Sequence, residues 1–458
     1  MRIVRWLPAA LPLLAMRCGG DVPAATDGGI DSSTPADAAT PDGDATIADV
    51  AADAPLKAEA EASTPTVYTD VTDASNWEVF DIASWLGATP SFTGAAFDGR
   101  YMYYAPASVE SGSASPLVRY DTLGAFTDSS SWSKFDMTQT TSGTVGFFGA
   151  AVVGSALYLV PALVFTGPNS VATRYDTTAS FTNAASYSVF DFTTIPTADS
   201  NAVGYAGSTY DGHYLYFVPY TNSIVVRYDT TASFGSTSAW SKVDLSARFP
   251  LNLDHRGGTY DGRYVYFAPV SGGGFVRYDT QGTFTDTNGA WELSTPNLGA
   301  TPPNSFFGEA FDGRNIYFAP LTNATSNNGG LSNVVVQYDT TAQFGSSGSW
   351  STTLTSSYGY TAAIFDGRYV NFVPCGIAYD VSAKQRFNRY DTSTSSWTDF
   401  DLIGVTQLNI YGTNFGKTWT GGAYDGQYVY FVPSGAPAVR FKTKSPPSMP
   451  TTYTGSFL

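Results

Sequence analysis

Short runs of alternating apolar and polar residues fill most of the chain, and these runs recur in one fixed order. Residues 260–291, YDGRYVYFAPVSGGGFVRYDTQGTFTDTNGAW, show one whole unit. One run ends at Asp-Gly, a second run rich in Tyr, Val and Phe ends at a proline, a third ends at Arg-Tyr-Asp-Thr, and a fourth begins at a tryptophan. Alternating runs between turn-forming residues indicate strands. Each unit therefore predicts four antiparallel β-strands.

The Asp-Gly pair is typical of a two-residue hairpin turn, because glycine adopts positive φ without strain. It recurs at intervals of roughly 50 to 59 residues, which is the sequence signature of a repeat architecture. A degenerate copy at Val153 and Gly154 completes a set of seven. The other six aspartates are Asp98, Asp211, Asp261, Asp312, Asp366 and Asp425.

Two further landmarks also occur seven times. The Arg-Tyr-Asp-Thr motif and its variants lie at 119–122, 174–177, 227–230, 277–280, 337–340, 389–392 and 440–443. The aromatic residues that open the fourth strand are Trp77, Trp132, Tyr187, Trp240, Trp291, Trp350 and Trp397. A sheet of four strands repeated radially is a propeller blade, so the sequence predicts an all-β, seven-bladed β-propeller over residues 66–446.

The two ends of this region complement each other. The first landmark along the chain is a fourth strand at Trp77–Asp81, whereas the last unit stops after its third strand at Arg440–Thr443. We therefore expect the N-terminal strand to complete the last blade and close the ring, which would hide exposed strand edges.

In the order and spacing of its strands the region resembles the Kelch family of propellers, over roughly residues 68–444. The resemblance lies in the hairpin turn, the following strand, the Tyr-Asp pair and the tryptophan. Where Kelch repeats carry a glycine pair after the second strand, this chain has Val-Pro or Ala-Pro, as at Val218-Pro219. The resemblance implies the propeller fold and does not imply one function.

The N-terminus is typical of an export signal. Arg2 and Arg5 precede an apolar run, Trp6–Met16, that is too short to span a bilayer. Cys18, followed by Gly-Gly-Asp, resembles the lipidated cysteine of bacterial lipoproteins, although Arg17 stands where that family has a small residue. We expect residues 1–18 to be a signal peptide with lipidation at Cys18; secretion without a lipid is the alternative. The protein would then be an outer-membrane or cell-surface lipoprotein, or secreted.

Residues 19–65 contain ten acidic residues against Lys57 alone and almost no large apolar side chain. Such a segment cannot bury enough surface to offset its chain entropy, so we expect a disordered tether, with residues 447–458 as a tail. The tether carries much of the net charge of −16. The sequence contains no cluster of Lys and Arg, and this argues against nucleic acid as a partner.

One ring of aromatic residues precedes the Asp-Gly position by six residues. Packing between blades explains this ring, and the alternative is an aromatic rim at the channel mouth that stacks on a sugar or a partner's side chain. The ring consists of Phe92, Phe147, Tyr205, His255, Phe306, Tyr360 and Trp419. Of these, Tyr205, His255, Phe306, Tyr360 and Trp419 are candidate ligand-binding residues.

Two charged residues break the pattern of neutral residues in the predicted inner strands. Arg256 and Glu309 lie in adjacent blades. With Asp254 and His255 they could form a polar ligand anchor at the channel mouth, and an interblade ion pair is the alternative.

Residues suited to catalysis are few. His213 and His255 are the only histidines, and we expect them on opposite faces, so no metal site and no cofactor are predicted. This also argues against a copper radical oxidase of the galactose oxidase type. Carboxylate pairs, Glu309 with Asp254 or Glu110 with Asp199, leave a hydrolase possible in principle. No residue is assigned a catalytic role.

The loops after the prolines and between blades vary in length, and both sets should emerge on one face. Since binding usually resides in variable loops on a fixed scaffold, we expect a monomeric binding propeller that recognises a protein or a glycan there, with a lipid anchor as its only membrane contact. An extracellular carbohydrate-active enzyme is the alternative, and a purely structural envelope component is a third.

Overall fold

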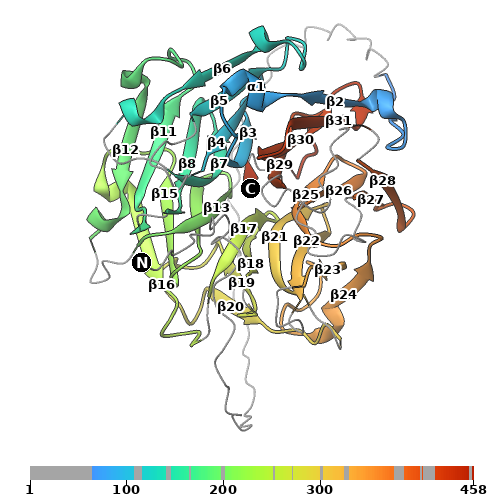
Figure 1. Cartoon of the computed structure of the whole chain (residues 1–458). Coiled ribbons are helices and arrows are strands. Elements are labelled where there is room, and N and C mark those ends of the chain that lie inside the picture. Colours follow the sequence, from blue (N-terminus) through green and yellow to red (C-terminus); the bar gives the residue numbers. More distant parts are fainter. Residues whose placement is uncertain are drawn as a thin grey trace, which may run out of the picture. The chain divides into compact units, whose positions relative to one another are not determined.

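The computed structural model describes residues 64–458 except 108–115, 141–145, 165–166, 197–201, 251–252, 271, 300–302, 324–329, 376–385, 403–404, 406–417, 453–455 and 458. Most of its strands form seven antiparallel sheets of four or five strands around a central axis (Figure 1), which confirms the predicted all-β, seven-bladed propeller. We number these blades in the chain order of their inner strands. No helix in the described part of the chain is long and apolar enough to cross a membrane.

Blades 1 to 4 each run from the inner strand to the outer strand in chain order. Their strands are β3 (Phe92–Phe97), β4 (Tyr101–Pro106), β5 (Leu117–Asp121) and β6 (Trp132–Phe135); β7 (Phe147–Val153), β8 (Ala156–Pro161), β11 (Val171–Asp176) and β12 (Tyr187–Asp191); β13 (Tyr205–Tyr210), β14 (Tyr214–Pro219), β15 (Ile224–Asp229) and β16 (Trp240–Asp244); and β17 (His255–Tyr260), β18 (Tyr264–Pro269), β19 (Phe275–Asp279) and β20 (Trp291–Ser294).

Blades 5 to 7 follow the same plan, except that the outer strand of blade 7 comes from the N-terminus. Their strands are β21 (Pro303–Phe311), β22 (Asn315–Asn323), β23 (Val334–Asp339) and β24 (Trp350–Leu354); β25 (Tyr360–Phe365), β26 (Tyr369–Pro374), β27 (Arg386–Asp391) and β28 (Ser396–Asp401); and β29 (Thr418–Tyr424), β30 (Tyr428–Ser434), β31 (Ala438–Lys442) and β2 (Trp77–Phe80).

The remaining elements are short. They are β1 (Val67–Tyr68), β9 (Leu163–Val164), β10 (Gly167–Pro168), β32 (Lys444–Ser445), β33 (Ser456–Phe457), α1 (Ile82–Leu86), and the 3₁₀ turns η1 (Ala74–Asn76), η2 (Ser129–Ser131), η3 (Met137–Gln139), η4 (Ala184–Ser186), η5 (Phe192–Thr194), η6 (Thr237–Ala239) and η7 (Ser347–Ser349).

The Asp-Gly hairpins are held by the aspartate side chain. In blade 1, Asp98 Oδ1 accepts hydrogen bonds from the backbone N–H of Arg100 at 2.8 Å and of Tyr101 at 2.6 Å, and Oδ2 accepts one from the Tyr103 hydroxyl at 2.7 Å. Gly99 has φ +100°, a conformation that residues with a Cβ rarely adopt. One carboxylate thus accepts hydrogen bonds from the backbone of the turn and from the hydroxyl of a buried tyrosine, which explains why the Asp-Gly pair recurs.

The arginine of the Arg-Tyr-Asp-Thr motif joins neighbouring blades. Arg277 of blade 4 lies over the Tyr264 ring, with its Cζ 4.0 Å from the ring centroid, and donates to the Tyr338 hydroxyl of blade 5 at 3.3 Å. It also pairs with Glu292 at 2.9 Å. These contacts give the repeated arginine a structural role between blades.

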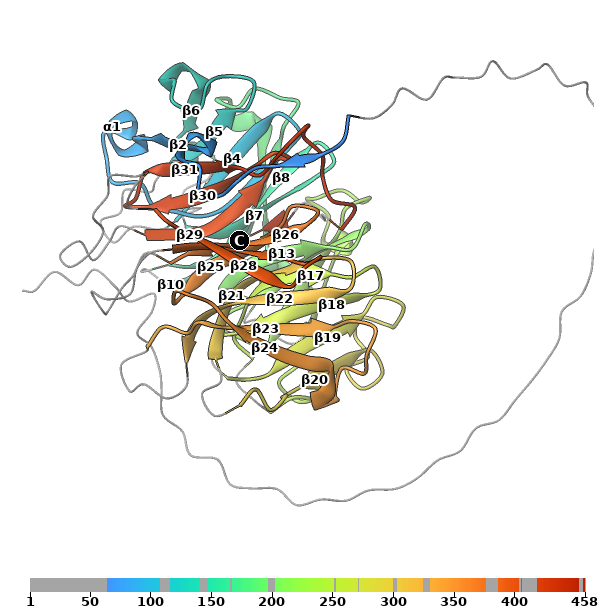
Figure 2. The same cartoon turned by 90° about the vertical axis from the view of Figure 1, so that its right-hand side faces the viewer.

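The N-terminal strand closes the ring, as the sequence predicts. β2 pairs antiparallel with β31, from Trp77 opposite Phe441 to Phe80 opposite Ala438, and the two strands lie side by side in Figure 2. Glu78 on β2 pairs with Arg440 on β31 at 2.8 Å. Immediately before β2, β1 pairs with β32. The first and last parts of the propeller are therefore joined by backbone and side-chain bonds.

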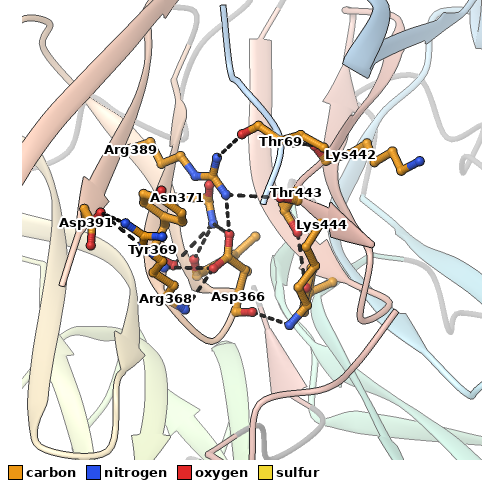
Figure 3. A network of polar contacts seen from close by, with 12 residues as sticks. Thr69, Asp366, Arg368, Tyr369, Asn371, Arg389, Asp391, Lys442, Thr443 and Lys444 are labelled. Atoms are coloured by element: carbon orange, nitrogen blue, oxygen red, sulfur yellow. Dashed lines mark hydrogen bonds and ion pairs between the residues drawn. The ribbon is translucent and has the colours of Figure 1, made fainter. Parts of the chain in front are cut away.

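Figure 3 shows a buried polar network at this closure. Arg389 of blade 6 donates to the backbone oxygen of Thr69 at 2.9 Å, to that of Thr443 at 3.4 Å, and to Asp366 at 2.8 Å. The Asp366 side chain is fully buried and that of Arg389 is 3% exposed. Lys444 donates to the backbone oxygen of Asp366 at 2.5 Å. This network ties both end segments to blade 6.

Two substitutions in the repeat account for this network. Blade 7 has Phe441 where the other blades have a tyrosine, and in blades 1, 4 and 5 this tyrosine accepts a hydrogen bond from the preceding blade's arginine. Arg389 therefore meets a ring without a hydroxyl, 5.4 Å from its Cζ. Blade 6 has Asn371 where blade 1 has Tyr103, and Asn371 donates to Asp366 Oδ2 at 3.0 Å. Arg389 can therefore reach Asp366 and the end segments.

The predicted tail contains one further strand. β33 pairs antiparallel with β7, with Ser456 opposite Ala151 and Phe457 opposite Ala150, so blade 2 gains a fifth strand at its inner edge. β33 also lies against the inner strands β3, β13 and β29 and is near the axis in Figure 1. The channel is thus partly filled by the chain's own C-terminal segment.

Candidate functional site

The two faces of the propeller differ in their connections. On one face, which we call the turn face, the first and second strands of each blade are joined by tight turns, such as 98–100 and 261–263. On the opposite face, which we call the loop face, the connections from the second to the third strand range from 435–437 to 375–385. Connections between blades emerge there too, from 355–359 to 402–417. Length variation is therefore concentrated on the loop face, as predicted.

Arg256 lies where the inner strands approach the loop face, and aromatic rings surround it. Its Cζ is 3.9 Å from the ring centroid of Phe307 on β21, 4.4 Å from that of Tyr220, which follows β14, and 4.6 Å from that of Phe148 on β7. We call these four residues the Arg256 cage. It draws on blades 2 to 5, so it lies at the channel rather than within one blade.

The Arg256 guanidinium has little compensation for its burial. Arg256 is 2% exposed, and burial lowers its pKa, while Tyr220 and the Asp254 carboxylate oppose that shift. Its Nε has no hydrogen-bond partner, and none of the ion pairs between described residues includes Arg256. Contacts with three rings stabilise the cation, but they do not neutralise it.

Glu309 is buried without a partner. It lies on β21 opposite Phe318 of β22 and is 6% exposed. Neither carboxylate oxygen has a hydrogen-bond partner, and burial raises the pKa well above its ordinary value. Burial is the only cause of the shift, and no ion pair joins Glu309 to Arg256 among the described residues. The two charged residues singled out in the sequence therefore lie in adjacent blades without pairing.

His255 is held as a neutral ring. Its Nδ1 lies 2.7 Å from the backbone oxygen of Leu253, and burial lowers its pKa to about 4. Nε2 has no hydrogen-bond partner, and the ring packs edge-on against Phe267 at a centroid distance of 6.1 Å. Asp254, the residue before it, is half-buried. His255 is thus placed for packing and carries no charge at neutral pH.

The other aromatic candidates are all buried. Tyr205, Phe306, Tyr360 and Trp419 are at most 1% exposed. Each contacts another ring of the interior: Tyr205 packs on Phe192, Phe306 on Phe275, Tyr360 on Phe372 and Trp419 on Phe431. Rings in this position have no exposed face for a sugar, and their contacts are those of the packing interpretation.

The other candidates for chemistry are dispersed. His213 is on the turn face, half-exposed, with Nε2 3.0 Å from Asp229 Oδ1, whereas His255 is at the loop-face end of its strand. Glu110 and Asp199 lie outside the described residues. Within the described part of the chain, no group of three or more His, Cys, Asp or Glu residues could hold a metal ion.

The three rings of the Arg256 cage were not predicted as site residues. Their signal lies in the position five residues before Asp-Gly, where Phe148 and Phe307 replace small residues in two of the blades near Arg256. The seven residues at this position are Thr93, Phe148, Ala206, Arg256, Phe307, Thr361 and Thr420. Tyr220 carried no periodic signal, because it lies in a connection of variable length.

No known protein family's sequence profile matches the chain, and no curated protein matches it in sequence. Solved structures match it in fold. A streptogramin B lyase structure has a TM-score of 0.51 at 10% identity, covering 80% of this chain and 97% of that chain. A catalytically inactive virginiamycin B lyase from Staphylococcus aureus with quinupristin has a TM-score of 0.53 at 9% identity, covering 80% and 98%.

The extracellular domain of a proposed hybrid two-component system from B. thetaiotaomicron has a TM-score of 0.51 at 11% identity, covering 82% of this chain and 43% of that chain. Identities this low establish a shared fold alone. The structures that share the fold include lyases and the extracellular domain of a two-component system, so the fold does not decide between catalysis and binding.

Proposed function

We propose that this chain is an exported, non-catalytic binding propeller that recognises a protein or a glycan through its loop face. The observation that carries the proposal is the contrast between the two faces. On the turn face a tight hairpin recurs, and the connection from the third to the fourth strand has ten or eleven residues in blades 1 to 5 and is 392–395 in blade 6. On the loop face both sets of connections vary from blade to blade, from 435–437 to 375–385 and from 355–359 to 402–417. Variable loops on a rigid scaffold are the usual location of a binding site.

The buried charges support binding over catalysis. A general acid must reach the reacting atom within hydrogen-bond distance. Glu309 has no hydrogen-bond partner, and the His255 ring, neutral at pH 7, has its Nδ1 beside a backbone oxygen. Among the described residues, neither side chain is hydrogen-bonded to a carboxylate that could form a catalytic pair with it. Arg256, in contrast, supplies fixed positive charge without proton transfer.

Export is part of the proposal. It rests on the signal-like residues 1–18, and the extracellular domain among the structural matches agrees with it. Cys18 would carry the lipid, and residues 19–65 would hold the propeller away from the membrane. Expression of the full chain with Cys18→Ser tests the anchor. The variant should move from the membrane fraction to the soluble exported fraction, whereas secretion without a lipid predicts no change.

The competing function is an extracellular carbohydrate-active hydrolase or lyase, and lyases are among the structural matches. The full chain should be applied to a glycan array and also incubated with the same glycans in solution. Mass spectrometry then measures whether any product forms. Binding without a change in ligand mass supports the binding propeller. Release of shortened or unsaturated products supports the enzyme.

A further inference from the structure

The Arg256 cage is the one place in the inner strands where the repeat places a full positive charge. The corresponding residues of the other six blades are neutral. The Arg256 Cζ lies 3.9 to 4.6 Å from three ring centroids, and the side chain is 2% exposed. A buried cation is normally paired with an anion. This one is not paired with any described residue.

The contacts of the cage leave one donor of the guanidinium for an anion. The three ring centroids lie 3.9 to 4.6 Å from Cζ, distances at which aromatic rings attract an arginine side chain. The N–H groups lie along the edge of the guanidinium plane, and the edge matches a carboxylate in a two-point contact. Nε, one of these edge donors, has no partner.

The approach to the cage is from the loop face. Arg256 follows His255, the first residue of β17, and β17 begins at that face. Tyr220 is half-buried and belongs to the short connection 220–223 between β14 and β15. It is the one member of the cage that comes from a loop, and its partly exposed side chain places the cage next to the loop face.

A second polar group lies at the same level of the inner strands. Thr361 of blade 6 occupies the position that Arg256 occupies in blade 4, is 3% exposed, and has a hydroxyl without a hydrogen-bond partner. The corresponding hydroxyls of Thr93 and Thr420 donate to the backbone oxygens of Phe147 and Phe92. A ligand that carries both a carboxylate and hydroxyl groups would satisfy Arg256 and Thr361 together.

We infer that Arg256 binds the carboxylate of a sugar acid, such as a uronate residue of an acidic glycan, at the loop-face end of the channel. This inference rests on the proposed binding function and assigns the chemistry of its ligand. The carboxylate accepts hydrogen bonds from the guanidinium edge, the Tyr220 hydroxyl lies beside it, and the sugar hydroxyls face Thr361.

Calorimetric titration of the full chain with galacturonate and glucuronate oligosaccharides tests the inference. The uncharged galactose and glucose oligosaccharides and an acidic glutamate peptide are the comparison ligands. The uronates should bind more than about tenfold tighter than the uncharged sugars and the peptide, because each of these lacks part of the matched chemistry.

Two variants locate the site. Arg256→Met keeps an apolar side chain in the cage and should weaken uronate binding more than about tenfold. Arg248→Met removes the same charge from an exposed side chain in the connection between β16 and β17, on the same face, and should leave binding unchanged. If Arg256→Met does not fold, Arg256→Lys replaces it in the test. Arg256→Lys keeps the charge without the planar edge and should bind uronates more weakly than the wild type.

Failure would take distinct forms. If the wild type binds no uronate, or Arg256→Met binds it as tightly as the wild type, the inference is overturned. Tighter binding of the glutamate peptide would overturn the assignment of a sugar acid. Binding of a neutral glycan that is unaffected by Arg256→Met would overturn the inference and leave the proposed binding function standing. The proposed function itself fails if ligand cleavage is observed.

Discussion

Burial decides the charge state of the ionisable side chains in the inner strands. Burial lowers the pKa of His255 to about 4, so its ring is neutral near pH 7, and burial raises the pKa of Glu309 well above its ordinary value, which favours the protonated carboxyl. An arginine does not become neutral on burial, because it stays protonated at any physiological pH. Arg256 is therefore the residue in this region whose charge persists and needs an anion.

Glu309 should make the protein less stable as pH rises. The unfolded chain releases the Glu309 proton near pH 4.3, while the folded chain keeps it to a higher pH. Between these two pKa values the unfolded state gains stability with pH, so the free energy of unfolding falls. Glu309→Gln removes this effect and should raise the free energy of unfolding at pH 8 by about 1–3 kcal/mol.

Thermal unfolding of wild type and Glu309→Gln at a series of pH values measures this difference. The advantage of the variant should be largest at pH 8 and should shrink toward pH 4. A difference that is constant across this range would mean that Glu309 is ionised in the folded protein.

The aromatic ring residues show what sequence alone can predict at this scale. Their periodicity indicated a common position, but not which way the side chains face. A β-bulge follows the aromatic residue in most inner strands, as between Tyr205 and Ser208. It changes the side to which the next residues point. The rings consequently lie between blades, whereas the following position, with Arg256 and Phe307, reaches the channel.

At the scale of the strand, close approach of the inner strands is the strictest constraint on sequence. A Cβ added to Gly94 would lie 2.6 Å from the Cα of Gly149 in the next blade, and one added to Gly149 would lie 3.0 Å from the Cα of Gly207. The repeat has glycine or alanine at this position in every blade. The structure adds that the obstacle is backbone, which cannot move aside as a flexible side chain can.

Gly94→Ala and Gly99→Ala form a matched pair that separates crowding from backbone strain. Both glycines have positive φ, but a Cβ on Gly99 would meet no atom within 4 Å. Gly99→Ala should destabilise the protein by about 1–2 kcal/mol through backbone strain. Gly94→Ala should lower the free energy of unfolding by about 1–3 kcal/mol more, because the new methyl group also clashes with the next blade. Denaturant unfolding measures both, and equal losses would show that the strands can separate at the axis.

At the scale of the whole molecule, closure of the ring depends on both ends of the propeller. The missing fourth strand of the last unit made closure predictable. The network around Arg389 was not predictable, because it combines two exceptions to the repeat, Asn371 and Phe441, with backbone oxygens of the end segments. β33 was also missed, because two paired residues are too few to give a periodic signal.

Asp366→Asn should therefore destabilise the closed ring strongly. It leaves the Arg389 guanidinium, which is 3% exposed, without its anion, and loss of one partner of a buried ion pair costs about 3–5 kcal/mol. Arg100→Gln removes the exposed pair with Asp121 on the turn face and should cost less than about 1 kcal/mol. Denaturant unfolding compares the two variants. Equal, small losses would show that the closure network adds little to stability.

The central claim is that the loop face binds the ligand, and binding by two variants of the full chain tests it most directly. One variant replaces 376–384 with a short Gly-Ser connection on the loop face. The other changes Arg100, Arg263 and Arg314, which are half or more exposed on the turn face, to alanine.

Binding is measured on a glycan array and, for any ligand found there, by calorimetry. We predict that the loop-face variant loses at least about tenfold in affinity and that the turn-face variant binds like the wild type. Loss of binding in the turn-face variant, with binding retained in the loop-face variant, would contradict the claim.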